Sequence, residues 1–215
     1  MRSAARSPQS LRQTTKVTIK KVNDESGSEG AIRLPSTDLV GLGLVGFATN
    51  CLMVVFNTIG VEKKDPEKNA PGWGLAHLSL GVMMVVLGVS DYMTLPLGAL
   101  SGYTGIALVF YGFFWIFLGG SLIRGLDLRP VGQVCIAYAI FDLWFLRGSW
   151  EINQGGTFYS LTILLVVLTV VFIVFYAAVH GKPGLLKVNA GLLIILALLG
   201  FYIGFSLIYP GYVAF

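Results

Sequence analysis

The sequence has little charge and little cysteine. Only 12% of its 215 residues are charged and 55% are hydrophobic, against about 25% and about 45–50% in an average soluble domain. A water-soluble domain is excluded, because its interior could not hold so many apolar side chains. The two cysteines, Cys51 and Cys135, lie in different apolar segments without a CxxC or His/Cys spacing. Neither a disulfide framework nor a metal site is indicated.

Catalytic motifs are also missing. The chain has no nucleophile elbow, phosphate-binding loop, HExxH motif or paired carboxylates at catalytic spacing, so we predict a protein that is not an enzyme and uses no cofactor. The net charge is +4, but seven of the fifteen Lys and Arg lie in the first 33 residues. Much of the positive charge therefore belongs to the N-terminal segment and not to a basic surface of a folded domain, so no nucleic-acid partner is expected.

The first 36 residues differ in composition from the rest of the chain. They are rich in Ser, Thr, Gln, Lys and Arg and poor in aromatic residues, which predicts a disordered basic tail. Six cations and no acid fall in residues 1–22. An organellar transit peptide is therefore the alternative to a cytosolic tail that binds anionic lipid. The plasma membrane is the expected location, with an organellar membrane as the alternative.

Six long apolar segments follow the tail. Each is near the length of about 20 residues that a helix needs to cross a bilayer core. We predict an all-α membrane protein, with residues 37–215 forming a six-transmembrane-helix bundle in lipid. The predicted helices cover residues 39–60, 72–90, 97–120, 131–147, 157–180 and 185–209.

Small residues at four-residue spacing are expected where these helices touch, because they let two backbones approach closely. Three such pairs occur in the apolar segments: Gly98 with Gly102, Ser101 with Gly105, and Gly200 with Gly204.

Ionisable residues inside the apolar segments are candidate functional residues, because a charge at bilayer depth is costly unless it is paired or wetted. Asp142 lies well inside the fourth segment, where it could titrate in a wet cavity or make a hydrogen bond between helices. His77 in the second segment is interpreted as a packing residue, and Lys187 as a side chain that reaches the membrane surface. Asp91 lies at a segment end.

Polar side chains in the apolar segments could line a path through the bundle. The residues alone therefore indicate a six-helix channel or transporter for a small solute. The candidates for the path are Asn50, Asn57, Asp91, Asp142, Ser160 and Thr162, together with Tyr111.

Several short motifs occur in an order and spacing that resemble one known family. They are Leu-Gly-Leu-Val-Gly-Phe at residues 42–47, Tyr-Gly-Phe-Phe-Trp at 111–115, Phe-Tyr-Ser-Leu-Thr at 158–162 and Ala-Leu-Leu-Gly-Phe-Tyr at 197–202. Over residues 38–205 the chain resembles the acetate uptake transporter family, the succinate–acetate permeases. It departs from the family pattern at residues 38–41, where the family has Asn-Pro-Ala-Pro.

The resemblance implies a path for a short carboxylate such as acetate, with or without proton coupling, through each protomer of a homo-oligomer, a hexamer in this family. It implies an apolar constriction at Phe47, Tyr111 and Leu161. A narrow apolar ring loses its water and resists a hydrated ion. Two alternatives remain. Residues 125–130 suggest a urea or short-amide channel, and the basic tail suggests a membrane scaffold that transports nothing.

The resemblance also implies that both termini lie in the cytoplasm. The positive-inside rule favours the opposite orientation, because the short loops place only Arg147 on the side of the termini. The seven cations on the other side are Lys63, Lys64, Lys68, Arg124, Arg129, Lys182 and Lys187.

Overall fold

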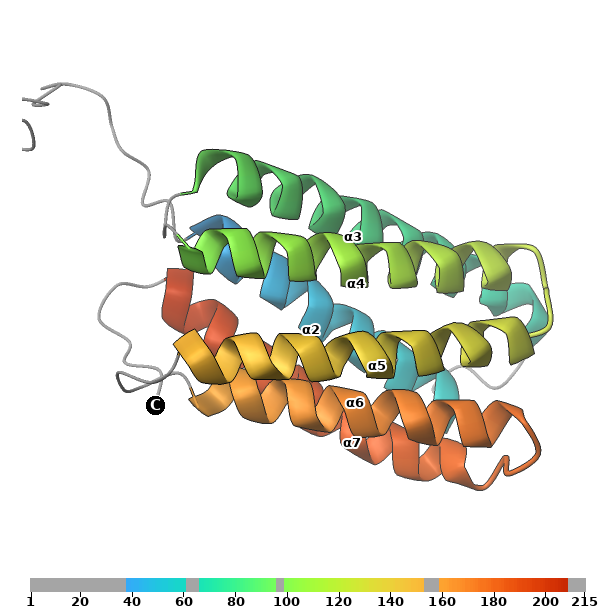
Figure 1. Cartoon of the computed structure of the whole chain (residues 1–215). Coiled ribbons are helices and arrows are strands. Elements are labelled where there is room, and N and C mark those ends of the chain that lie inside the picture. The colour runs from blue at the N-terminus through green and yellow to red at the C-terminus, as the bar shows by residue number, and fades with distance from the viewer. Residues whose placement is uncertain (1–37, 61–65, 96–98, 153–158, 209–215) are drawn as a thin grey trace, which may run out of the picture. The chain divides into compact units, whose positions relative to one another are not determined.

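The computed structural model describes residues 38–60, 66–95, 99–152 and 159–208, and no β-strand occurs within these ranges. They form six helices, which belong to one compact unit. The predicted all-α class is confirmed, whereas the predicted tail lies outside the described residues. The helices are α2 (Asp38–Ile59), α3 (Pro66–Thr94), α4 (Ala99–Ile123), α5 (Arg129–Ile152), α6 (Tyr159–Val179) and α7 (Leu185–Ile208) (Figure 1).

All six helices are long and apolar enough to cross a membrane, with candidate spans of 21 to 27 residues. Lipid offers no partners for backbone N–H and C=O groups, so a spanning segment satisfies them internally as a helix. Large hydrophobic side chains are exposed on the outer faces, for example Val86, Ile140 and Leu198. The fold is that of an integral, multi-pass membrane protein.

Helices α3 and α5 extend furthest beyond the apolar runs that predicted them. Helix α3 begins at Pro66 rather than at residue 72, because proline fits the first turn of a helix, where no intrahelical N–H bond is lost. Helix α5 continues to Ile152 rather than ending at residue 147. Hydropathy marks only the part of a helix that lies in hydrocarbon, so polar helix ends escape it.

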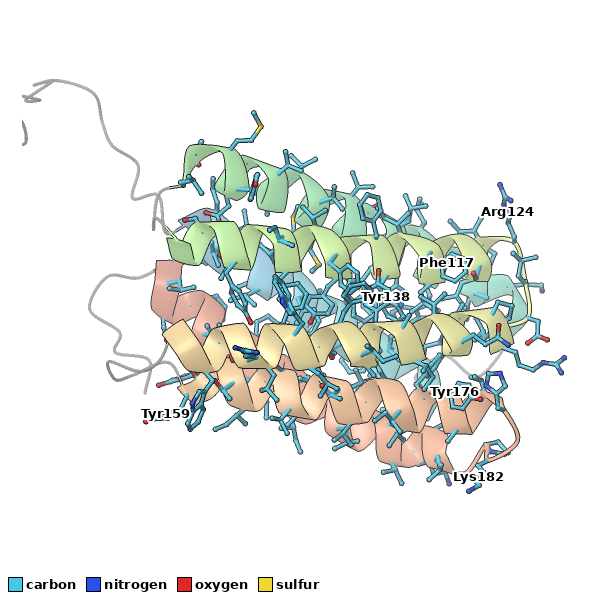
Figure 2. All side chains as sticks on the ribbon, in the orientation of Figure 1. Phe117, Arg124, Tyr138, Tyr159, Tyr176 and Lys182 are labelled. Atoms are coloured by element: carbon cyan, nitrogen blue, oxygen red, sulfur yellow. The ribbon has the colours of Figure 1, made fainter. Side chains whose placement is uncertain are left out.

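Successive helices run in opposite directions, so that α2, α4 and α6 begin at the same end of the bundle (Figure 1). We call the opposite end the basic end. Figure 2 shows Arg124 and Lys182 there, and Tyr159, the first residue of α6, at the other end. Five of the six Lys and Arg in the described ranges lie at the basic end: Lys68, Arg124, Arg129, Lys182 and Lys187.

Helices α3 and α4 pack through three pairs of glycines that recur every seven residues on both helices. A Cβ atom placed on Gly81 would lie 2.8 Å from the carbonyl oxygen of Gly112, and the reverse distance is also 2.8 Å. Seven residues are about two helical turns, so the pairs form one continuous row. The pairs are Gly74 with Gly119, Gly81 with Gly112, and Gly88 with Gly105.

Helices α2 and α7 also meet at small residues. A Cβ atom on Gly204 would lie 2.9 Å from the carbonyl oxygen of Gly41, and one on Gly200 would lie 3.1 Å from the Cβ of Ala48. The predicted contact at Gly200 and Gly204 is confirmed. The predicted role of Gly102 is wrong, because the nearest atom to its added Cβ is 3.9 Å away, on Leu95.

Candidate functional site

Two small cavities lie inside the bundle. The Trp115 cavity, with Trp115, Asn189 and Cys135 in its lining, has about 30 Å³ of space for water-sized molecules. The Tyr103 cavity, with Tyr103 and Thr104 in its lining, has about 40 Å³. A water needs about 10–15 Å³ on this measure, so each cavity could hold a few waters or a solute of a few heavy atoms.

Three side chains line both cavities and therefore form a wall between them. We call Phe47, Tyr111 and Leu168 the partition. Phe47 is 3% exposed, Tyr111 5% and Leu168 2%, and the ring centroids of Phe47 and Tyr111 lie 6.2 Å apart. The cavities lie on opposite sides of one apolar wall contributed by α2, α4 and α6.

The partition coincides with the predicted constriction in two residues of three. Leu161 lines the Tyr103 cavity together with Phe47 and Tyr111, so the structure brings the three predicted residues around one cavity. Leu161 is absent from the lining of the Trp115 cavity, where Leu168 appears instead. Leu168 lies seven residues further along α6, about 10 Å deeper at 1.5 Å per residue.

Asp142 is fully buried and joins three helices. Its Oδ1 accepts a hydrogen bond from the hydroxyl of Tyr111 on α4, and its Oδ2 accepts one of 3.4 Å from the Thr169 hydroxyl on α6. The carboxyl group of Asp142 thus binds both Tyr111 of the partition and Thr169, which is next to Leu168. The prediction that Asp142 faces the bundle interior agrees with this position, and its bonds between helices fit both interpretations of its role.

Asn50 and His77 form a second buried polar pair. Nδ1 of His77 lies 2.8 Å from Oδ1 of Asn50. Because a carboxamide oxygen only accepts, Nδ1 is the donor. The His77 ring stacks on Trp115, with centroids 5.4 Å apart and planes 9° apart. His77 therefore packs inside the bundle, but its other ring nitrogen, Nε2, has no hydrogen-bond partner among the described residues.

Asp91 and Thr162 take part in side-chain hydrogen bonds. The fully buried Asp91 accepts a hydrogen bond of 3.0 Å from the Thr104 hydroxyl, and Thr104 lines the Tyr103 cavity. The Thr162 hydroxyl lies 3.1 Å from that of Ser149 and joins α6 to α5. Of these residues only Thr104 reaches a cavity lining.

The remaining two polar candidates, Ser160 and Asn57, differ in exposure. Ser160 is 5% exposed, and its hydroxyl has no hydrogen-bond partner among the described residues. Asn57 is exposed on the outer surface of α2, so its predicted place on an interior path is wrong. Within a helix that is apolar on all sides, sequence alone does not identify the inward face.

The segment between α4 and α5, which suggested an amide channel, lies at the basic end. Asp127 accepts a hydrogen bond of 2.9 Å from the backbone N–H of Arg129 and forms an ion pair of 2.6 Å with its guanidinium. These contacts cap the start of α5 and hold the pKa of Asp127 below its usual value. Both side chains are exposed, so the pair stabilises a turn and lines no cavity.

Sequence reasoning missed Leu168, Thr169 and Asn189. Asn189 is 3% exposed and lines the Trp115 cavity. The criterion that selected Asn50, a polar residue within an apolar segment, would also have selected Asn189. Leu168 carried no such signal, because it is one leucine among several apolar residues.

Comparisons with protein-family models and with curated protein sequences each find no match to the chain. The class rests on the fold and the site: an integral membrane protein whose described residues form six helices around the two cavities, an architecture compatible with a transporter or channel.

Proposed function

We propose that the protein transports acetate or another short monocarboxylate across its membrane along a path through each protomer. One observation carries the proposal: two cavities lie at successive depths of the bundle and share the side chains of the partition as lining. A solute held in one cavity would reach the other if Phe47, Tyr111 and Leu168 moved aside.

The partition also explains how such a path would stay closed. Its members are apolar except for the Tyr111 hydroxyl, which is bonded to Asp142. A narrow apolar wall excludes water and hydrated ions. A protonated carboxyl group donates a hydrogen bond of its own, so protonation of Asp142 would change how Tyr111 is held. This contact is the structural basis on which we include proton coupling in the proposal.

The resemblance to the acetate uptake transporter family supplies the substrate class and the homo-oligomer, a hexamer in this family. The plasma membrane is the location that we propose. The cavity sizes support a short substrate, because about 30 Å³ and about 40 Å³ leave space for only a few heavy atoms.

The test is uptake into liposomes that contain the purified protein. We expect labelled acetate to enter faster than into protein-free liposomes, and faster still when the outside is acidic. Urea should enter at the protein-free rate. Uptake of urea without acetate would replace the proposal by a channel for urea or short amides, and uptake of neither would favour the scaffold.

A further inference from the structure

Two residues that line the Trp115 cavity each carry a buried polar atom without a hydrogen-bond partner among the described residues. These atoms are the indole Nε1 of Trp115 on α4 and the amide Oδ1 of Asn189 on α7. Trp115 is 4% exposed and Asn189 is 3% exposed, and both residues line the cavity. Native proteins satisfy most buried polar groups, so one unpaired donor and one unpaired acceptor around the same cavity call for an explanation.

The surroundings of Trp115 fix its ring. His77 stacks on one face. Phe47 and Phe114 meet the ring edge-on, with centroid distances of 6.2 Å and 5.2 Å. The indole therefore cannot turn toward another acceptor without disturbing three neighbours. Its N–H therefore stays without a partner among the described residues.

The rest of the lining is unsuited to an anion. No Lys, Arg or His belongs to the described lining of the Trp115 cavity, and the acceptor Asp142 is bonded to the Tyr111 that lines it. An ionised carboxylate would enter without a counter-ion, which is unfavourable in an apolar site. It also offers only acceptors, so it could not pair with Oδ1 of Asn189.

An undissociated acid has the complementary groups. Its carbonyl oxygen could accept from Nε1–H of Trp115, its hydroxyl could donate to Oδ1 of Asn189, and its short alkyl group would meet the apolar wall. We propose that the Trp115 cavity binds a small uncharged solute with one acceptor and one donor, and that the monocarboxylic acid occupies it undissociated. This inference rests on the proposed function and adds the chemical form of the substrate.

Acetamide is the probe for the uncharged form, because it has nearly the shape of acetic acid and does not ionise. We expect acetamide to enter protein-containing liposomes and to compete with labelled acetate. Urea should do neither, because its second amino group would meet the apolar wall in place of the methyl group. An imposed membrane potential should leave the protein-dependent acetate uptake unchanged, because an undissociated acid carries no charge. Liposomes without protein correct for the acid that crosses the lipid directly.

Two variants remove the proposed partners one at a time. Asn189→Leu keeps the size but removes the acceptor, and Trp115→Phe removes the donor. Each should lower the uptake of acetate and acetamide in parallel, by about tenfold for one lost hydrogen bond. The matched controls are Asn57→Leu and Trp144→Phe, which make the same changes at exposed positions on α2 and α5 and should leave uptake unchanged.

Thermal unfolding separates binding from a structural role. Oδ1 of Asn189 is unpaired, so Asn189→Leu should unfold at or above the wild-type temperature while uptake falls. Loss of stability together with uptake would make Asn189 structural and overturn the inference. Acetate uptake that rises with a positive interior would also overturn it, while leaving acetate transport intact. Absence of any protein-dependent acetate uptake would overturn the proposed function itself.

Discussion

Replacement of one glycine in the α3–α4 row should destabilise the bundle, whereas the same replacement eight residues away should not. In Gly112→Ala, the new Cβ would lie 2.8 Å from the carbonyl oxygen of Gly81 and 3.0 Å from the backbone nitrogen of Val85. Ordinary contacts of a Cβ atom begin near 3.4 Å. Because both neighbours are backbone atoms, relief requires the two helices to separate by about half an ångström.

Overpacking of this kind typically costs about 1–3 kcal/mol. Each 1 kcal/mol lowers the unfolding temperature of a chain of this size by about 2–4 °C. The control is Gly120→Ala on the same helix, where an added Cβ meets nothing within 4 Å. Alanine favours a helix over glycine by up to about 1 kcal/mol, so the control should be neutral or slightly more stable.

The assay is thermal unfolding of both purified variants in detergent, followed by acetate uptake in liposomes. We expect Gly112→Ala to unfold several degrees below Gly120→Ala. Uptake should also change in Gly112→Ala, because Tyr111 of the partition precedes Gly112 on α4 and would move with the helix. Equal unfolding temperatures for the two variants would refute the close approach of α3 and α4.

Three further predictions concern the path and its orientation. Leu168→Ala should raise acetate uptake and admit larger acids, because it opens the wall between the two cavities. Leu161→Ala should have a smaller effect, because Leu161 borders only the Tyr103 cavity. If these variants misassemble while selectivity is unchanged, both residues have a packing role alone. Acetamide does not ionise, so any pH dependence of its uptake comes from the protein. Asp142→Asn should flatten that dependence, and an unchanged pH profile would contradict a titrating role for Asp142. A cysteine in place of Arg124 should react with an impermeant thiol reagent from outside the cell, as the resemblance implies; reaction only after permeabilisation would place the basic end in the cytoplasm.

The number and type of the helices could be predicted because lipid leaves so little choice. A long apolar segment must satisfy its own backbone, and only a helix does so within one segment. The ends of α3 and α5 could not be predicted in the same way, because they continue past the apolar run into polar sequence.

The inward faces of the helices were much harder to predict. In a soluble helix, the apolar stripe marks the interior. In lipid the outer face is apolar too, so Asn57 and Asn189 look alike in sequence. Asn57 is nevertheless exposed, whereas Asn189 is buried. The glycine row was missed for a related reason. Small residues spaced four apart are the usual signal of close helix packing in membranes, whereas α3 and α4 place their glycines every seven residues.

The depth of the partition shows where a sequence resemblance is least informative. Leu161 and Leu168 are seven residues apart, so they share one face of α6 and periodicity cannot separate them. Only the position of each leucine along the helix axis distinguishes the two. Phe47 and Leu168 each lie nine residues beyond the first residue of their helix, but Leu161 lies two beyond. A wall at Leu168 therefore stands near the middle of the bundle, with one cavity toward each end. A barrier in the middle is the arrangement that lets a transporter admit a solute from one side while it remains closed to the other.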